Sequence, residues 1–312
     1  MTTVASFYRF VDLADPADLR ERLQVLCEDR GLLGTVLVAQ EGVNGSLSGE
    51  ERDIRAVLDW LASELSLGEP IDARWTTAGD PPFRRMRVRL KPEIVTLGRP
   101  DLQPQRRTGR HVSPEEWNEI LDRADALLID TRNRYEIEVG TFPGAIDPGT
   151  ASFREFPEFA MRLVGEDRNR PLAMFCTGGI RCEKATALML ELGFTDVVQL
   201  QGGILNYLDT MAGQDNRWDG ECFVFDKRVA VDRDLAEGGY VQCHACRRPL
   251  SAEDVASPDY REGVSCPHCI AELQQERAAR LEERRRQVRI ARERGTAHIG
   301  PGVVDGPKAG RG

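Results

Sequence analysis

The chain has 312 residues, of which 41% are hydrophobic, and a formal net charge of −9. It is too long for one ordinary core, and no stretch is apolar enough for a bilayer span. We therefore expect two or three domains, a cytoplasmic location and no membrane partner. Eight cysteines in such a chain indicate reactive or metal-binding thiols rather than a disulfide framework.

The charge is unevenly distributed along the chain. Residues 271–312 hold ten Arg or Lys against six Asp or Glu, a net of +4, which leaves −13 for residues 1–270. An acidic body repels nucleic acid on average. Any RNA partner must therefore be met by local basic patches.

Residues 1–98 alternate strand and helix signals in the order βαββαβ, which predicts an α+β, ferredoxin-like domain. Asp15 followed by Pro16 marks the start of the first helix. Asn44-Gly45 predicts a tight turn before the third strand. The expected strands lie near 7–11, 35–39, 46–48 and 84–90, and the second helix lies around 54–61.

The strand expected at 84–90 carries a basic stripe. Alternation with period two places Arg85, Arg87 and Arg89 on one face. The opposite, packed face should hold Met86, Val88 and Leu90. The stripe fits RNA phosphates, and it fits equally a solvated face whose charges deter edge pairing.

Residues 99–112 have little apolar periodicity and are interpreted as a linker. A second domain is expected over 113–217, opening with a helix capped by Ser113. Short apolar runs then alternate with helical segments, which predicts an α/β domain with a parallel sheet. The runs lie at 126–129, 171–175 and 197–200, and the helical segments around 151–164 and 183–192.

Cys176 is the predicted nucleophile, because it ends the middle apolar run, where parallel sheets place their active sites. A glycine-containing loop leads from it to a helix near Cys182, and the helix N-terminus and Arg181 favour an anion and a thiolate. The alternative is a small buried hydrophobe at a strand end. Cys182 either resolves a persulfide or donates a weak hydrogen bond. The expected anion-binding loop comprises Thr177, Gly178, Gly179, Ile180 and Arg181.

The run 176–182 resembles the rhodanese loop, in which the cysteine carries a persulfide. Segments 128–132, 140–146 and 201–203 resemble other parts of the same domain. Related phosphatases have Cys-x5-Arg, whereas Arg181 lies five positions after Cys176. This shorter loop disfavours a phosphatase.

Segments 41–45, 176–184 and 218–226 together resemble the bacterial tRNA uridine(34) hydroxylase family over about residues 1–270. The resemblance implies an acylphosphatase-like N-terminal domain. Residues 1–98 contain no matching anion-binding loop, so we expect this domain to position RNA rather than to catalyse. It also implies oxygen-dependent formation of 5-hydroxyuridine at the wobble position of tRNA, with Cys176 as the persulfide-forming residue. The implied partner is tRNA and not DNA. The sequence has no flavin or nicotinamide fingerprint and no two-His-one-carboxylate iron motif, so it does not indicate the electron donor.

Segment 218–270 ends in two CxxC pairs with the spacing C-x2-C-x19-C-x2-C. This spacing predicts a structural zinc ion, with redox-active pairs or unliganded thiols as the alternatives. The predicted ligands are Cys243, Cys246, Cys266 and Cys269. Within the pairs, His244 and His268 are expected to be spectators or RNA contacts. Residues 271–312 should form a charged helix and a disordered, glycine-rich tail.

Two other functions fit parts of this pattern. A plain sulfurtransferase would pass sulfane sulfur from Cys176 to a small molecule or a protein, and it would need neither the N-terminal domain nor the CxxC pairs. A non-enzymatic RNA-binding or redox-sensing module would use the loop thiol only to report oxidation.

Overall fold

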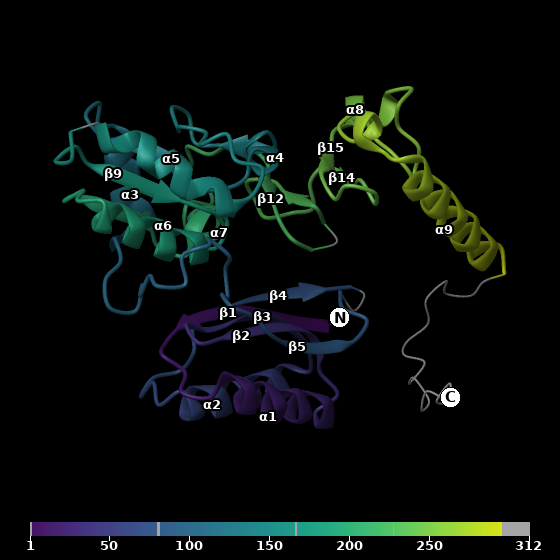
Figure 1. Ribbon diagram of the computed structural model, residues 1–312, viewed down its shortest axis with the longest axis horizontal. Helices are drawn as coiled ribbons and strands as arrows, with labels where there is room; N and C mark the ends of the chain where they lie inside the picture. Colours follow the sequence, from purple (N-terminus) through teal and green to yellow (C-terminus); the bar gives the residue numbers. More distant parts are fainter. Residues whose placement is uncertain (1, 80–81, 166, 227, 295–312) are drawn as a thin grey trace.

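The structure is a computed structural model that describes residues 2–79, 82–165, 167–226 and 228–294. An N-terminal αβ domain lies beneath a second α/β domain, and a C-terminal extension projects to one side (Figure 1). The expectation of a disordered tail concerns residues that lie mainly outside the described ranges.

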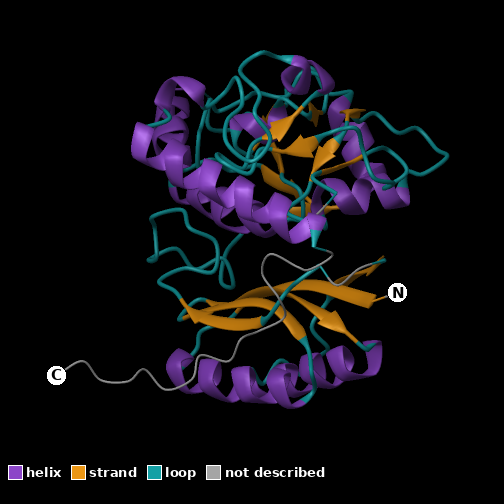
Figure 2. Ribbon diagram, turned by 90° about the vertical axis from the view of Figure 1, so that its right-hand side faces the viewer, coloured by secondary structure: helices purple, strands orange, loops and turns teal. Residues whose placement is uncertain are grey.

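The N-terminal domain is a five-stranded sheet with two helices packed on one face. The strand order is β4-β1-β3-β2-β5, of which the first four strands give the expected ferredoxin-like arrangement. The opposite face looks toward the second domain (Figure 1, Figure 2). The elements are β1 Thr2–Phe10, α1 Pro16–Asp29, β2 Leu33–Ala39, β3 Gly42–Gly49, α2 Glu51–Glu64, β4 Ala73–Ala78 and β5 Met86–Leu90.

The edges of this sheet differ from the prediction. The fourth strand of the ferredoxin-like core is Ala73–Ala78, which the sequence reasoning missed. The strand expected to close the fold is β5, which pairs parallel to β2 at the opposite edge. Met86 and Val88 enter the core as predicted, but Leu90 is 51% exposed because it ends an edge strand.

The predicted turn at Asn44-Gly45 was also wrong. Strands β2 and β3 pair from Ala39 opposite Gly42, so the turn comes earlier, and Asn44 and Gly45 lie inside β3. Gly45 serves close packing, because a Cβ there would lie 2.8 Å from the carbonyl oxygen of Thr35.

The second domain has a four-stranded parallel sheet in the order β6-β10-β9-β7. Buried side chains of α5 and α6 pack on one face, and those of α3 and α7 pack on the other. The main elements are β6 Arg110–Val112, α3 Pro114–Leu121, β7 Leu127–Asp130, α4 Arg134–Ile137, β8 Gly140–Thr141, α5 Phe156–Arg162, β9 Leu172–Phe175, α6 Ile180–Glu191, β10 Val197–Leu200 and α7 Gly203–Thr210, with 3-10 turns at Phe153–Glu155 and Leu163–Gly165.

Residues on both sides of 113–217 pack with the second domain. The end of the expected linker at 99–112 is strand β6, and Leu97 and Leu102 are buried in the core of this domain. Beyond residue 217, Trp218 and Cys222 are buried in the same domain, and β11 pairs with β8. The apolar side chains in these flanks attach them to the second domain.

The C-terminal segment contains short strand pairs, a small helix and one long helix that projects away from the body (Figure 1). The long helix agrees with the charged helix expected from the sequence. The elements are β11 Asp219–Gly220, β12 Cys222–Phe223, β13 Ala230–Val231, β14 Val241–Gln242, β15 Pro249–Leu250, α8 Ala252–Ala256, a 3-10 turn at Ile270–Glu272 and α9 Gln275–Glu293.

Candidate active site and metal centre

The loop after β9 holds Cys176 at the carboxyl end of the parallel sheet, with 1% of its surface exposed. Helix α6 begins four residues later at Ile180, and Gly178 is the exposed point of the loop. Helix α7 contacts the loop through backbone hydrogen bonds. The N–H of Ile204 donates to the carbonyl oxygen of Cys176 at 2.9 Å. The N–H of Leu205 donates to the carbonyl oxygen of Thr177 at 3.1 Å.

The environment of Cys176 favours the thiolate. Burial opposes ionisation, but the Cys182 thiol, the positive charge of Arg181 and loop N–H groups outweigh it and lower the pKa of Cys176 to about 6. The N–H of Gly179 donates to the sulfur at 3.2 Å. By contrast, burial raises the pKa of Cys27 to about 12 and that of Cys222 to about 12. Of these three buried thiols, Cys176 is the one whose pKa is lowered.

Arg181 acts on the loop mainly through its charge. Its guanidinium is buried and donates to both carboxylate oxygens of Glu136, at 2.6 and 2.8 Å, and to Thr177 Oγ1 at 3.3 Å. Glu136 thereby fixes the position of the guanidinium. This pairing was not predicted from the sequence. An anion at the loop would find Arg181 already paired, and would depend more on the N–H groups.

Cys182 faces Cys176 from the first turn of α6. Burial and the neighbouring Cys176 raise the pKa of Cys182 well above its ordinary value, so it remains a thiol and can donate to the Cys176 thiolate. Its sulfur also lies 3.6 Å from Thr131 Oγ1. Both thiols are free in the structure, as the hydrogen-bonding role and the resolving role both require.

The N-terminal domain reaches this loop through Tyr8 of β1. The Tyr8 hydroxyl donates to Glu183 Oε1 at 3.4 Å, and a Cβ on Gly179 would lie 2.8 Å from that hydroxyl. Glu183 Oε1 also pairs with His111 Nε2 at 2.8 Å, which raises the pKa of His111, and Glu183 Oε2 accepts from Gln199 at 3.2 Å. No local pattern predicts this network, since its members come from four separate elements.

A second cross-domain contact is the ion triad of Lys184, Glu41 and Glu93. The Lys184 ammonium is fully buried and lies 2.8 Å from Glu41 Oε2 and 2.5 Å from Glu93 Oε2. Glu93 also accepts the N–H groups of Leu97 and Gly98, both at 3.0 Å. Two of the segments that carried the family resemblance, those containing Glu41 and Lys184, thus meet in space.

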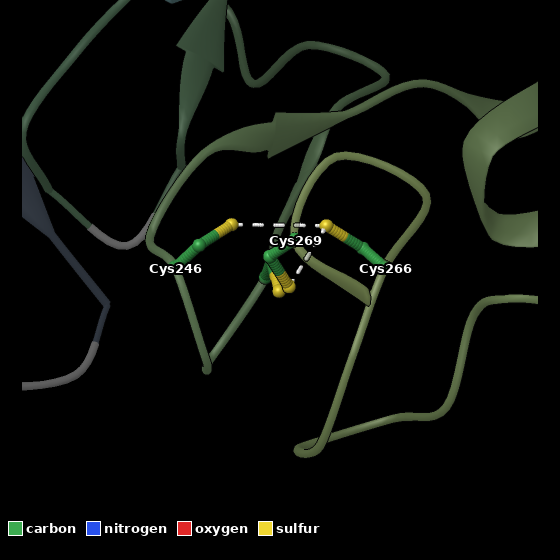
Figure 3. A group of neighbouring side chains, drawn as sticks. Cys246, Cys266 and Cys269 are labelled. Atoms are coloured by element: carbon green, nitrogen blue, oxygen red, sulfur yellow. Dashed lines mark hydrogen bonds between the residues drawn. The ribbon is translucent and has the colours of Figure 1, made fainter. Parts of the chain in front are cut away.

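The four C-terminal cysteines converge as their spacing predicted. All four Sγ atoms lie within 4.8 Å of one another. The sulfurs of Cys246, Cys266 and Cys269 point toward one another (Figure 3), with Cys246–Cys266 at 3.7 Å and Cys266–Cys269 at 3.6 Å. Tetrahedral zinc with Zn–S bonds of about 2.3 Å requires S–S separations of about 3.8 Å. The cluster therefore fits a tetrahedral metal ion.

The two histidines in the CxxC pairs stand apart from that sulfur cluster. His268 Nε2 pairs with Asp254 Oδ1 at 3.1 Å. His244 lines a groove between the cysteine segment and α9, together with Arg84 of the N-terminal domain. Other basic residues of this groove are Arg261, Arg284, Arg285, Arg286 and Arg289, and its acidic ones are Glu262, Glu282 and Glu283.

Two protein-family models match the chain: the UPF0176 acylphosphatase like domain over residues 2–94 and the Rhodanese-like domain over residues 113–210. A curated relative from Rhizobium leguminosarum bv. trifolii (strain WSM2304), named tRNA uridine(34) hydroxylase, is 46% identical over 297 residues, which cover 95% of this chain and 96% of the relative. The chain belongs to the tRNA uridine(34) hydroxylase family. A relative of the same name from Sinorhizobium fredii (strain NBRC 101917 / NGR234) is also 46% identical over 297 residues, covering 95% of this chain and 94% of the relative.

These matches confirm the predicted family and the predicted fold class. Solved structures similar to the chain include a rhodanese-like domain from Anabaena, 16% identical with a TM-score of 0.30, covering 36% of this chain and 80% of that one. Another is a human single-domain sulfurtransferase, 28% identical with a TM-score of 0.27, covering 32% of this chain and 96% of that one. Among the described residues, every helix is too short or too polar to cross a bilayer.

Proposed function

We propose that this protein is an enzyme that hydroxylates uridine 34 of tRNA to 5-hydroxyuridine, with molecular oxygen as co-substrate and Cys176 as its reactive residue. The observation that carries the proposal is the 46% identity to relatives of that name across 95% of the chain. The match extends well beyond the rhodanese-like domain at residues 113–210. A plain sulfurtransferase would not require the other segments.

The role proposed for Cys176 follows from its surroundings. A thiol with a pKa of about 6 is mostly thiolate at neutral pH, which is the form that attacks sulfur or carbon centres and carries a persulfide. The loop N–H groups and Arg181 would balance the negative charge on that sulfur. Cys182 would serve as a hydrogen-bond donor to it.

The partner in this proposal is tRNA, which implies a cytoplasmic location and no role for DNA. Recognition would rest on local basic surfaces, because residues 1–270 carry a net charge of −13. Arg85 and Arg89 are exposed and Arg87 is partly exposed beside the core positions of β5, which suits phosphate contacts. The groove along α9 offers a second basic surface.

We assign a structural zinc ion to the C-terminal cysteines. Four sulfur ligands would leave no open coordination position, so the ion would fold this segment rather than take part in the reaction. The ligands would be Cys243, Cys246, Cys266 and Cys269.

The proposal is tested by nucleoside mass spectrometry of tRNA from a deletion strain complemented with wild type, Cys176→Ser or Cys27→Ala. Cys27 is a buried cysteine of the N-terminal core and serves as the control. We expect 5-hydroxyuridine derivatives to return with wild type and Cys27→Ala and to stay absent with Cys176→Ser. Unchanged derivatives in the deletion strain, assayed without any parallel pathway for the same base, would contradict the proposal. Thiosulfate turnover without RNA would then favour the sulfurtransferase.

A further inference from the structure

Phe225 is an aromatic side chain presented to solvent beside the Cys176 loop. It is 70% exposed, more than any other large hydrophobic side chain in the described part of the chain. A single exposed apolar residue is common on protein surfaces and by itself indicates nothing. The surroundings of Phe225 give it significance.

The ring of Phe225 is held in place by packing against its neighbours. The ring of the buried Phe223 packs against it edge to face, with centroids 5.0 Å apart, and Phe223 packs in the same way on Tyr135 at 5.4 Å. Next to the ring, the N–H and the guanidinium of Arg228 both donate to Asp226. An exposed ring on such a support loses little conformational entropy when a ligand covers it.

The ring also lies next to the reactive loop. The guanidinium carbon of Arg181 is 5.9 Å from the centre of the Phe225 ring, and the same guanidinium contacts Thr177, the residue after Cys176. Arg228 follows Phe225 by three positions and is paired with Asp226, and Arg74 of β4 lies close enough to Arg228 for their charges to interact. The guanidinium of Arg74 lies 4.0 Å from a carboxylate oxygen of Asp209. An aromatic face with cations at its edge matches a nucleotide, which has a π face and a phosphate.

We propose that Phe225 is a stacking platform for a nucleobase adjacent to the reacting uridine, with Arg74 and Arg228 contacting the phosphates on that side. The proposal rests on the proposed function and assigns part of its tRNA-binding surface. A flanking base fits better than the reacting one, because Arg181 and Thr177 separate the ring from Cys176. Enzymes that act on a base in single-stranded RNA commonly stack its neighbours on aromatic rings.

The test compares Phe225→Ala, Phe225→Leu and Phe225→Tyr in the full chain, with Met161→Ala as a control for loss of another exposed apolar side chain. Binding of an unmodified anticodon stem-loop RNA is measured at fixed salt. Stacking is worth about 1–3 kcal/mol per base, which corresponds to a loss of affinity of about 5-fold to 150-fold. We expect that loss for the alanine and leucine variants, and near wild-type binding for the tyrosine variant and the control.

A matched set of RNAs identifies the stacked base. The RNAs are stem-loops with an abasic site on one side or the other of the target uridine, and their affinities for wild type and for Phe225→Ala are measured. At the stacked position the abasic site should weaken wild-type binding by the same factor as the alanine substitution. The two changes together should weaken binding no more than either change alone. Additive losses at both positions would overturn the proposal, as would a leucine variant that binds like wild type.

Two controls separate this proposal from the loop and from the proposed function. The pH dependence of Cys176 alkylation should be the same in wild type and Phe225→Ala, and a shifted midpoint would mean that the ring only supports the loop. Should wild type bind the stem-loop without ever hydroxylating tRNA, the proposed function would fail while the binding comparison still decides the role of Phe225.

Discussion

Replacing Cys182 by alanine should raise the pKa of Cys176 and slow its reactions near neutral pH. The thiol of Cys182 is a leading cause of the low pKa of Cys176, about 6. Hydrogen bonds to charged groups contribute about 1.5–3 kcal/mol, S–H donors fall at or below the lower end, and 1.36 kcal/mol equals one pKa unit. We therefore expect a pKa of about 7 for Cys176 in this variant. The thiolate fraction at pH 7 then falls from about 90% to about 50%.

The assay is the rate of iodoacetamide alkylation of Cys176 against pH, followed by mass spectrometry of the peptide that contains it. Because Cys176 is 1% exposed, the plateau rate reports how often the site opens, and the midpoint reports ionisation. Cys182→Ser is the matched control, since its hydroxyl can still donate, and its midpoint should stay near the wild-type one. An unchanged midpoint in Cys182→Ala would refute the reasoning. Peroxide-induced disulfide formation between the two cysteines in wild type would instead favour the resolving role.

Three further outcomes are expected. Lys184→Met should lower the free energy of unfolding in urea by about 3–5 kcal/mol, because Glu41 and Glu93 would remain buried without a cation; a change below about 1 kcal/mol would contradict the triad as described. Since His111 has a raised pKa in the folded state, its contribution to stability is fully present below pH of about 6.5 and lost as pH rises through the raised pKa, so His111→Gln should flatten the stability profile there. A strong chelator should release about one zinc ion per chain, Cys266→Ser should bind none, and Cys176 alkylation should not change; a metal-free wild type would refute the site.

Local patterns were sufficient to predict the position of the loop after β9 and the cysteine cluster. Cys176 follows a run of buried apolar residues and precedes glycines and a helix, so its place at a strand end could be inferred from a few consecutive residues. The CxxC pairs could also be inferred from a few consecutive residues, because the two cysteines of each pair lie on one turn of the chain. Strand Ala73–Ala78 was missed because its burial does not alternate, since it is an edge strand that depends on β1 for its hydrogen bonds.

The contacts between domains could not be predicted from the sequence. Lys184 and Glu41 are 143 positions apart, and neither helix periodicity nor composition indicates that they meet. A buried lysine is rare enough that the sequence alone would place it on the surface. The same holds for Glu136, whose pairing with Arg181 depends on how α4 packs against the loop.

The contact of Tyr8 with helix α6 and with Gly179 of the loop bears on how long Cys176 stays reduced. A thiolate that persists at neutral pH is also the form that peroxide oxidises, first to a sulfenic acid and then irreversibly. With 1% of Cys176 exposed and the N-terminal domain held by a fully buried lysine, the resting protein shields this thiol. Access for a base as large as uridine then requires that shield to open. We therefore expect conditions that open this site to RNA to shorten the oxidative lifetime of Cys176 as well.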